Sequence, residues 1–181
     1  MNLPNKLTMI RIFSVPLLIA CFYLRGITEY WNLIAAFVLV ASSATDLIDG
    51  RIARATGQVT NFGTRMDPIA DKLLYCSAFI MLTGIGSLPA IYTVIFIARE
   101  IIISGFRLVA AEQRIVIAAD RIGKAKTFVQ FIGILWMLLG NPIFRLIGIP
   151  FDRIAMAAAA VLSVWSCWNY IHGNIRSIRL F

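Results

Sequence analysis

The sequence predicts an all-α integral membrane protein with six transmembrane helices, a short interfacial segment before the first of them, and both termini in the cytoplasm. Three observations support this prediction. The 181-residue chain is 60% hydrophobic and only 14% charged, whereas a soluble domain carries about 25% charged residues. Six separate apolar runs are each long enough to cross a bilayer. The Lys and Arg residues also fall unevenly on the two sides of these runs.

A membrane-spanning helix needs about 20 mostly apolar residues. Runs of this kind predict spans at 8–25, 31–50, 65–84, 89–107, 124–141 and 153–172. The chain begins with MNLPNKLTMIRI, which lacks a cleavage site and predicts a retained N-terminal segment at the membrane interface. Lys6 and Arg11 in this segment either anchor it near lipid headgroups or contact a substrate. No stretch resembles a linker, so we expect a single domain over residues 1–181.

An even number of spans places both termini on the same side of the membrane. With the termini inside, only Arg25, Arg145 and Arg153 lie outside, and the other 14 of the 17 Lys and Arg residues lie inside. The positive-inside rule therefore places both termini in the cytoplasm. The net charge of +8 largely reflects this topology, and no nucleic-acid partner is expected.

The cysteine, histidine and aromatic residues predict little chemistry. The three cysteines are far apart and form no CxxC pair, so neither a disulfide framework nor a metal-thiolate site is expected. His172 is expected at the membrane interface. Aromatic residues expected at span ends or on lipid faces are Trp31, Trp136, Trp165, Trp168 and Tyr170. The run AMAAAAV from Ala155 is expected to pack closely against another helix.

Four aspartates lie at the inner ends of two predicted spans, where a carboxylate is costly unless it is paired. Asp46 and Asp49 are three residues apart at the end of the second span, and Asp67 and Asp71 are four apart at the start of the third. These spacings place each pair on one helix face, and a short loop between antiparallel helices brings the pairs together. Four close carboxylates repel one another, and hard divalent cations such as Mg²⁺ compensate them. The array therefore predicts a two-metal site for phosphate chemistry.

The sequence offers two other interpretations of these acids. Neutralisation within a salt-bridged loop would involve Arg51, Arg54, Arg65 and Lys72. Alternatively, the carboxylates would line the cation or proton pathway of a transporter. A fifth acid, Glu100, is expected to pair with a nearby cation rather than to bind metal.

The residues between the aspartates favour an enzyme. From Asp46 to Asp71 the chain reads DLIDGRIARATGQVTNFGTRMDPIAD. This stretch resembles the signature of the CDP-alcohol phosphatidyltransferases, D-x2-D-G-x2-A-R-x8-G-x3-D-x3-D. All eight fixed positions match, namely Asp46, Asp49, Gly50, Ala53, Arg54, Gly63, Asp67 and Asp71.

The resemblance implies a role for each part of the signature. The four aspartates would hold two Mg²⁺ or Mn²⁺ ions that bind the pyrophosphate of CDP-diacylglycerol. Asp71 would also act as the general base that takes a proton from the acceptor hydroxyl. The expected contacts of CDP-diacylglycerol are Gly50, Ala53, Arg54, Thr60, Gly63, Asn5 and Thr8. A homodimer is also implied.

The acceptor is expected to be sn-glycerol 3-phosphate. The stretches NLPNKLTMIR, IAREIIISGFR from Ile97 and RIGKAKT from Arg121 are similar to the phosphatidylglycerophosphate synthases of this family. Independently, cations gather at the inner ends of the fourth and fifth spans, where they suit a phosphate monoester: Arg99, Arg107, Arg121, Lys124 and Lys126. The same cations alternatively serve the positive-inside bias and anionic headgroups.

We therefore expect transfer of the phosphatidyl group from CDP-diacylglycerol to glycerol 3-phosphate, with release of CMP. The alternatives are the same chemistry with inositol phosphate, serine or inositol as acceptor, or a cation-binding membrane transporter. The short chain suggests the cytoplasmic membrane of a bacterium, with the active site at the cytoplasmic face.

Overall fold

The structure, a computed structural model, describes residues 3–56, 61–113, 115, 121–145 and 148–174. Within these ranges, the side chains of residues 3–8, 46–56, 61–65, 67, 68, 121, 143 and 145 are not described. The described backbone is predominantly helical and contains no strand. The chain divides into two compact units: unit 1 comprises Met1–Ile85 with Leu138–Gly140, and unit 2 comprises Gly86–Met137 with Asn141–Phe181.

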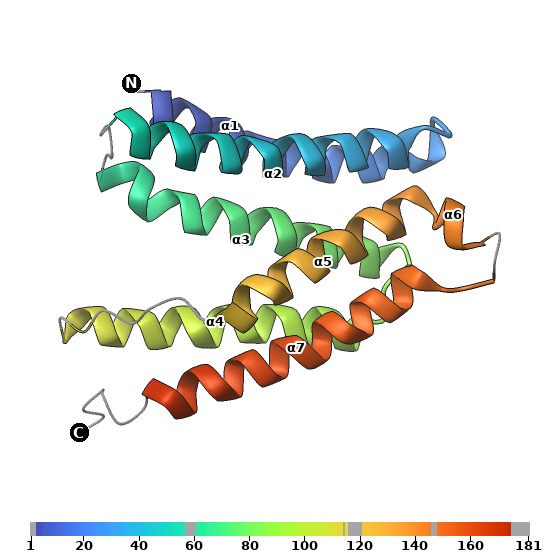
Figure 1. Ribbon diagram of the computed structural model, residues 1–181. Helices are drawn as coiled ribbons and strands as arrows, with labels where there is room; N and C mark the ends of the chain where they lie inside the picture. The colour runs from blue at the N-terminus through green and yellow to red at the C-terminus, as the bar shows by residue number, and fades with distance from the viewer. Residues whose placement is uncertain (1–2, 57–60, 114, 116–120, 146–147, 175–181) are drawn as a thin grey trace. The chain divides into compact units, whose positions relative to one another are not determined.

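Unit 1 contains the helices α1 (Leu3–Tyr23), α2 (Trp31–Thr56) and α3 (Asn61–Gly84), with the short 3₁₀ helix η1 (Leu24–Gly26) after α1. The helix α1 is unbroken, so the expected interfacial segment and the first predicted span form one helix. Figure 1 shows α2 and α3 running in opposite directions, with the end of α2 and the start of α3 at the same end of unit 1.

The core of unit 1 lies where α1 packs against both α2 and α3. Leu18 of α1, Leu39 of α2 and Leu74 of α3 are almost completely buried. Ala35 on α2 and Ala70 on α3 are also buried. Small side chains at such positions let helix backbones approach closely, which favours association of helices in a membrane.

Unit 2 contains α4 (Ala90–Glu112), most of α5 (Arg121–Leu139), the short helix α6 (Pro142–Arg145) and α7 (Phe151–Asn174). The helix α4 packs against α7. The turn after α5 contains Asn141 in a left-handed conformation, with φ of 56°. The Asn141 Nδ2 atom donates hydrogen bonds to the carbonyl of Ile149 (2.9 Å) and to Asp152 Oδ1 (3.3 Å), which stabilise this strained conformation.

The helices α5 and α7 approach each other closely at Gly133. A Cβ atom at this position would lie 2.6 Å from Met156 Sδ and 3.7 Å from Ala155 Cβ. Buried residues of α7 here include Ala155, Met156, Ala159 and Ala160. The expectation that the alanine run from Ala155 packs against another helix is therefore confirmed.

Each of the six predicted spans overlaps one of the long helices α1, α2, α3, α4, α5 and α7. Three segments within the described residues are long and apolar enough to cross a membrane: Met9–Gly26, Ile122–Leu139 and Phe151–Asn174. The apolar part of α2 is shorter, at Trp31–Thr45. In α4, charged residues such as Arg99 and Glu100 interrupt the apolar sequence but not the helix. An integral membrane protein is supported, whereas the count of six spans and the orientation of the termini stay predictions.

Large apolar side chains are exposed along both units. Phe13 on α1 is 65% exposed, and Trp165 and Trp168 on α7 are 58% and 72% exposed. Surfaces of this kind are unusual on soluble monomers and are expected where lipid replaces water. The two tryptophans thus occupy the exposed faces that the sequence predicted. Tyr170 is only 3% exposed, so a lipid face is wrong for this residue, because it packs inside unit 2. Its other expected place, towards the end of a span, agrees with its position four residues before the end of α7 at Asn174.

Candidate functional site

The eight signature residues lie on two neighbouring helices of unit 1. Those on the last turns of α2 are Asp46, Asp49, Gly50, Ala53 and Arg54, and those on the first turns of α3 are Gly63, Asp67 and Asp71. Asn5 and Thr8 lie on α1. Of these ten residues, only Asp71 has a described side chain, and Thr60 lies outside the described residues.

A contact between α2 and α3 establishes how the two helices face each other. Ser43 Oγ and Tyr75 Oη lie 3.3 Å apart, within hydrogen-bond distance. Asp46 follows Ser43 by three residues, and Asp71 precedes Tyr75 by four, so each aspartate lies about one helical turn from the contact on the same face. Because α2 and α3 are antiparallel (Figure 1), both turns lead toward the same end of unit 1.

The carboxylate of Asp71 has a cationic neighbour on α1. Arg11 Nε lies 3.4 Å from Asp71 Oδ1, and the Arg11 side chain is only 1% exposed, whereas that of Asp71 is 38% exposed. The carbonyl oxygen of Arg11 also accepts a hydrogen bond of 2.7 Å from Ser14 Oγ. Arg11 is therefore a buried partner of an aspartate and not a headgroup anchor. The sequence contained no clear signal for this pairing, since Arg11 lies only three residues inside the predicted span that begins at residue 8.

Of the four predicted metal ligands, Asp71 is the one whose side chain the structure describes. Among the described residues, no group of three or more His, Cys, Asp or Glu side chains lies close enough to hold a metal ion. Three of the four predicted ligands, Asp46, Asp49 and Asp67, have side chains outside that description. The metal site therefore stays a prediction from the signature.

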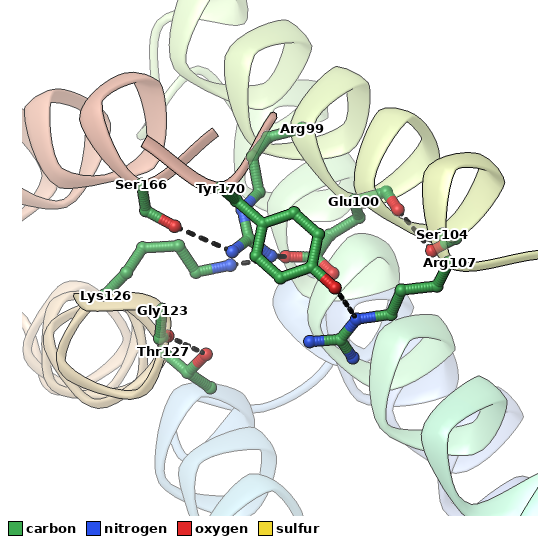
Figure 2. Close-up of polar contacts among 9 residues, drawn as sticks. All are labelled: Arg99, Glu100, Ser104, Arg107, Gly123, Lys126, Thr127, Ser166 and Tyr170. Carbon is green, nitrogen blue, oxygen red and sulfur yellow. Dashed lines mark hydrogen bonds and ion pairs between the residues drawn. The ribbon is translucent and has the colours of Figure 1, made fainter. Parts of the chain in front are cut away.

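In unit 2, Glu100 of α4 is the centre of a buried polar cluster. Arg99 Nη1 donates to Glu100 Oε1 at 3.0 Å, and Lys126 Nζ of α5 donates to the same oxygen. Arg99 Nη2 also donates to Ser166 Oγ of α7 at 2.8 Å. Figure 2 shows these side chains converging from α4, α5 and α7. The expectation that Glu100 pairs with a cation is confirmed. The Lys126–Glu100 pair links α5 to α4, and the Arg99–Ser166 hydrogen bond links α4 to α7.

Gly123 on α5 leaves room for this cluster. A Cβ atom at Gly123 would lie 3.2 Å from Arg99 Nη2 and 3.7 Å from Ser166 Oγ. The absence of a side chain thus lets the Arg99 guanidinium pass between α5 and α7. Burial is deep: Lys126 is 2% exposed and Ser166 is fully buried, while Arg99 is 12% exposed.

Arg107 of α4 contacts Tyr170, which lies one helical turn after Ser166 on α7. Its Nε atom donates a hydrogen bond of 3.0 Å to Tyr170 Oη. The guanidinium carbon also lies 5.3 Å from the centre of the Tyr170 ring, within the range of a cation–π interaction. Arg107 is exposed, unlike Arg99.

The five predicted acceptor-binding cations are thus placed differently. Arg99 and Lys126 both contact Glu100, while Arg107 and Lys124 are exposed. The side chain of Arg121, at the start of α5, is outside the described residues. Glu100, Ser166 and Tyr170 complete this arrangement. Of these three, only Glu100 had been expected from the sequence to contact a cation, because a buried hydroxyl produces no pattern along the chain.

Comparisons with known proteins provide independent information. The sequence profile of the CDP-alcohol phosphatidyltransferase family matches residues 1–165. A protein of Bacillus subtilis (strain 168) named CDP-diacylglycerol--glycerol-3-phosphate 3-phosphatidyltransferase is 36% identical over 188 residues, covering 98% of this chain and 97% of its own. A protein of the same name from Rickettsia bellii (strain RML369-C) is 34% identical over 170 residues, covering 93% of each chain. A protein of Mycobacterium tuberculosis (strain H37Rv) named probable phosphatidylglycerophosphate synthase is 38% identical over 180 residues, covering 98% of this chain and 83% of its own.

Proposed function

Since the chain belongs to the CDP-alcohol phosphatidyltransferase family, we propose that it transfers the phosphatidyl group of CDP-diacylglycerol to sn-glycerol 3-phosphate. The products are phosphatidylglycerophosphate and CMP. The family was predicted from the signature between Asp46 and Asp71 and is confirmed by the match over residues 1–165. The relatives named above cover nearly the whole chain and support this acceptor.

The Ser43–Tyr75 contact is the observation that supports the catalytic site best. This contact lies one helical turn from Asp46 on α2 and one from Asp71 on α3, which supports a shared site where these two helix ends meet. Asp49 and Asp67 belong to the same turns of these helices. Four aspartates without a histidine form a donor set that suits Mg²⁺ or Mn²⁺. When bound there, two such ions would neutralise charge on the pyrophosphate of the substrate.

The remaining steps involve the chain's own residues. Asp71 takes the proton of the acceptor hydroxyl, and that oxygen forms a bond to the phosphorus attached to diacylglycerol. The bond between this phosphorus and the oxygen of CMP breaks, and CMP leaves. No covalent enzyme intermediate is required, because positioning and charge neutralisation lower most of the barrier in phosphoryl transfer.

Two sets of residues bind the substrates. CDP-diacylglycerol contacts Gly50, Ala53, Arg54, Thr60, Gly63, Asn5 and Thr8. The phosphate of the acceptor is bound by Arg107 and Lys124, which are exposed, together with Arg121, Arg99 and Lys126. An acceptor with two negative charges uses these cations more fully than serine or inositol.

The proposal also covers the setting of the enzyme. We place residues 1–181 as one membrane domain with six spans in the cytoplasmic membrane of a bacterium. The active site faces the cytoplasm, where the basic residues gather. A homodimer completes the proposal.

A purified-protein assay tests this function. Protein in detergent is given CDP-diacylglycerol, Mg²⁺ and radiolabelled glycerol 3-phosphate, and we expect release of CMP together with a labelled lipid. Parallel reactions contain inositol phosphate, serine or inositol. CMP release with only one of these would replace the acceptor, whereas no CMP with any acceptor and metal-dependent uptake into vesicles would favour a transporter.

A further inference from the structure

A buried tyrosine of α7 holds an exposed arginine of α4 in unit 2. Tyr170 is 3% exposed and makes an edge-to-face contact with Phe106 of α4 at 5.9 Å between ring centres. Its hydroxyl oxygen accepts the hydrogen bond from Arg107 Nε. The packing of the ring therefore determines where the hydroxyl oxygen of Tyr170 lies, so Arg107 is held by a rigid group.

This hydrogen bond restricts how Arg107 can bind an anion. A guanidinium binds two oxygens either through Nε and one Nη or through its two Nη groups. Because Tyr170 occupies Nε, the two Nη groups provide the remaining bidentate edge. Figure 2 shows both Nη atoms of Arg107 directed away from the tyrosine oxygen.

A comparison of Arg107 with Arg99 indicates which arginine is prepared for a ligand. Both are on α4 and both donate to a hydroxyl of α7, with Ser166 and Tyr170 four residues apart on one face of that helix. Arg99 also pairs with Glu100, so an acid already offsets its charge. Among the described residues, Arg107 forms a hydrogen bond with Tyr170 but no ion pair with an acid. An exposed guanidinium that is oriented but not neutralised is suited to an incoming phosphate.

We propose that Tyr170 is a positioning residue, which orients Arg107 so that its two Nη groups bind the phosphate of glycerol 3-phosphate. This inference rests on the proposed function and adds a residue to it. The tyrosine does not touch the substrate itself. The tyrosine orders the long side chain of Arg107 before the phosphate arrives, so that less side-chain entropy is lost on binding.

Tyr170→Phe tests the inference because it removes only the hydroxyl and retains the packed ring. We expect the KM for glycerol 3-phosphate to rise about fivefold to tenfold, the effect of one lost hydrogen bond on affinity. The kcat and the KM for CDP-diacylglycerol should stay within about twofold of the original values. The matched control is Tyr92→Phe on α4, where a ring stacked on Phe96 loses its hydroxyl away from these cations, and wild-type kinetics are expected.

A double-mutant cycle shows whether Tyr170 acts through Arg107. Arg107→Ala should raise the KM for glycerol 3-phosphate on the order of a hundredfold, and adding Tyr170→Phe should change it by less than about twofold. Wild-type kinetics for Tyr170→Phe, or equal effects of that change with and without Arg107, would overturn the inference. If Tyr170→Phe does not fold, Arg107→Lys provides the test. Lysine lacks the two-pronged group, and an unchanged KM would refute oriented bidentate binding.

Failure of the inference is distinguishable from failure of the proposed function. If the wild-type protein releases CMP only with a neutral alcohol, the proposed acceptor is wrong before any variant is compared. If glycerol 3-phosphate is the acceptor but Arg107→Ala leaves its KM unchanged, the proposed function stands and the role of Arg107 and Tyr170 is refuted.

Discussion

Gly133→Ala provides a direct test of the packing in unit 2, because this glycine lies where α5 meets α7. The added methyl group would lie 2.6 Å from Met156 Sδ and 3.2 Å from Met156 Cγ. Carbon and sulfur atoms in contact are normally about 3.5–4.0 Å apart, so the methyl group enters about 1 Å too far. Met156 is 1% exposed, and its side chain has little room to move aside.

The expected cost follows from this overlap. Overpacking of a closely packed core costs about 1–3 kcal/mol, and replacing a helical glycine by alanine returns up to about 1 kcal/mol. A net loss of about 1–2 kcal/mol corresponds to a fall of about 2–8 °C in the midpoint of thermal unfolding for a chain of this size. The midpoint is measured in detergent by tryptophan fluorescence or by the fraction of protein that remains unaggregated.

Gly105→Ala is the matched control. Gly105 lies inside α4, and nothing would lie within 4 Å of a Cβ atom there. The same chemical change should therefore leave the midpoint unchanged or raise it slightly. The double variant Gly133→Ala with Met156→Ala should be more stable than the sum of the single effects predicts. An unchanged midpoint for Gly133→Ala, or strict additivity in the double variant, would refute the close approach of α5 and α7.

Three further predictions concern the charged residues. Asp71→Asn should lower CMP release by about 10²–10⁴-fold, the usual contribution of a general base, and should retain binding of CDP-diacylglycerol. The control is Glu29→Gln, which changes an exposed acid. Near-normal turnover of Asp71→Asn would disprove the role of Asp71 as the base. Chelation with EDTA should abolish CMP release and added Mg²⁺ or Mn²⁺ should restore it; full activity in excess chelator would count against the two-metal site. Glu100→Gln should cost about 3 kcal/mol in stability because Lys126 and Arg99 lose a buried carboxylate. Its thermal midpoint should fall well below that of Glu112→Gln, which changes an exposed acid on the same helix. Equal midpoints would show that the ion pairs contribute little to stability.

The positions of the helices could be predicted from the sequence because the signal is local. Apolar runs of about 20 residues, separated from one another by Gly and Pro, identify helices without any knowledge of which helices pack together. All six long helices overlap the runs, although α2 ends at Thr56, beyond the expected residue 50. Polar residues near its end provide no hydropathy signal, so the last turns of this helix could not be found in that way.

Part of the candidate site could be predicted from the sequence for the same reason, and part of it could not. The signature from Asp46 to Asp71 could be read from the sequence because its members lie within two helical ends and a short connection. The pairing of Arg11 with Asp71 could not, since it joins α1 to α3. Tyr170 was assigned to a span end or a lipid face because aromatic residues are common there, and only the packing of α7 against α4 shows that it is buried.

By itself, the sequence determined that this protein is a membrane-embedded member of a phosphatidyltransferase family, because hydropathy and a spaced motif are properties of neighbouring residues. Only the tertiary structure decided which cations of unit 2 are engaged and which are exposed. The partners in the contacts Lys126–Glu100, Arg107–Tyr170 and Arg99–Ser166 are 26, 63 and 67 residues apart in the chain. Contacts of this range depend on which faces of α4, α5 and α7 meet, and that choice is made by the packing of whole helices.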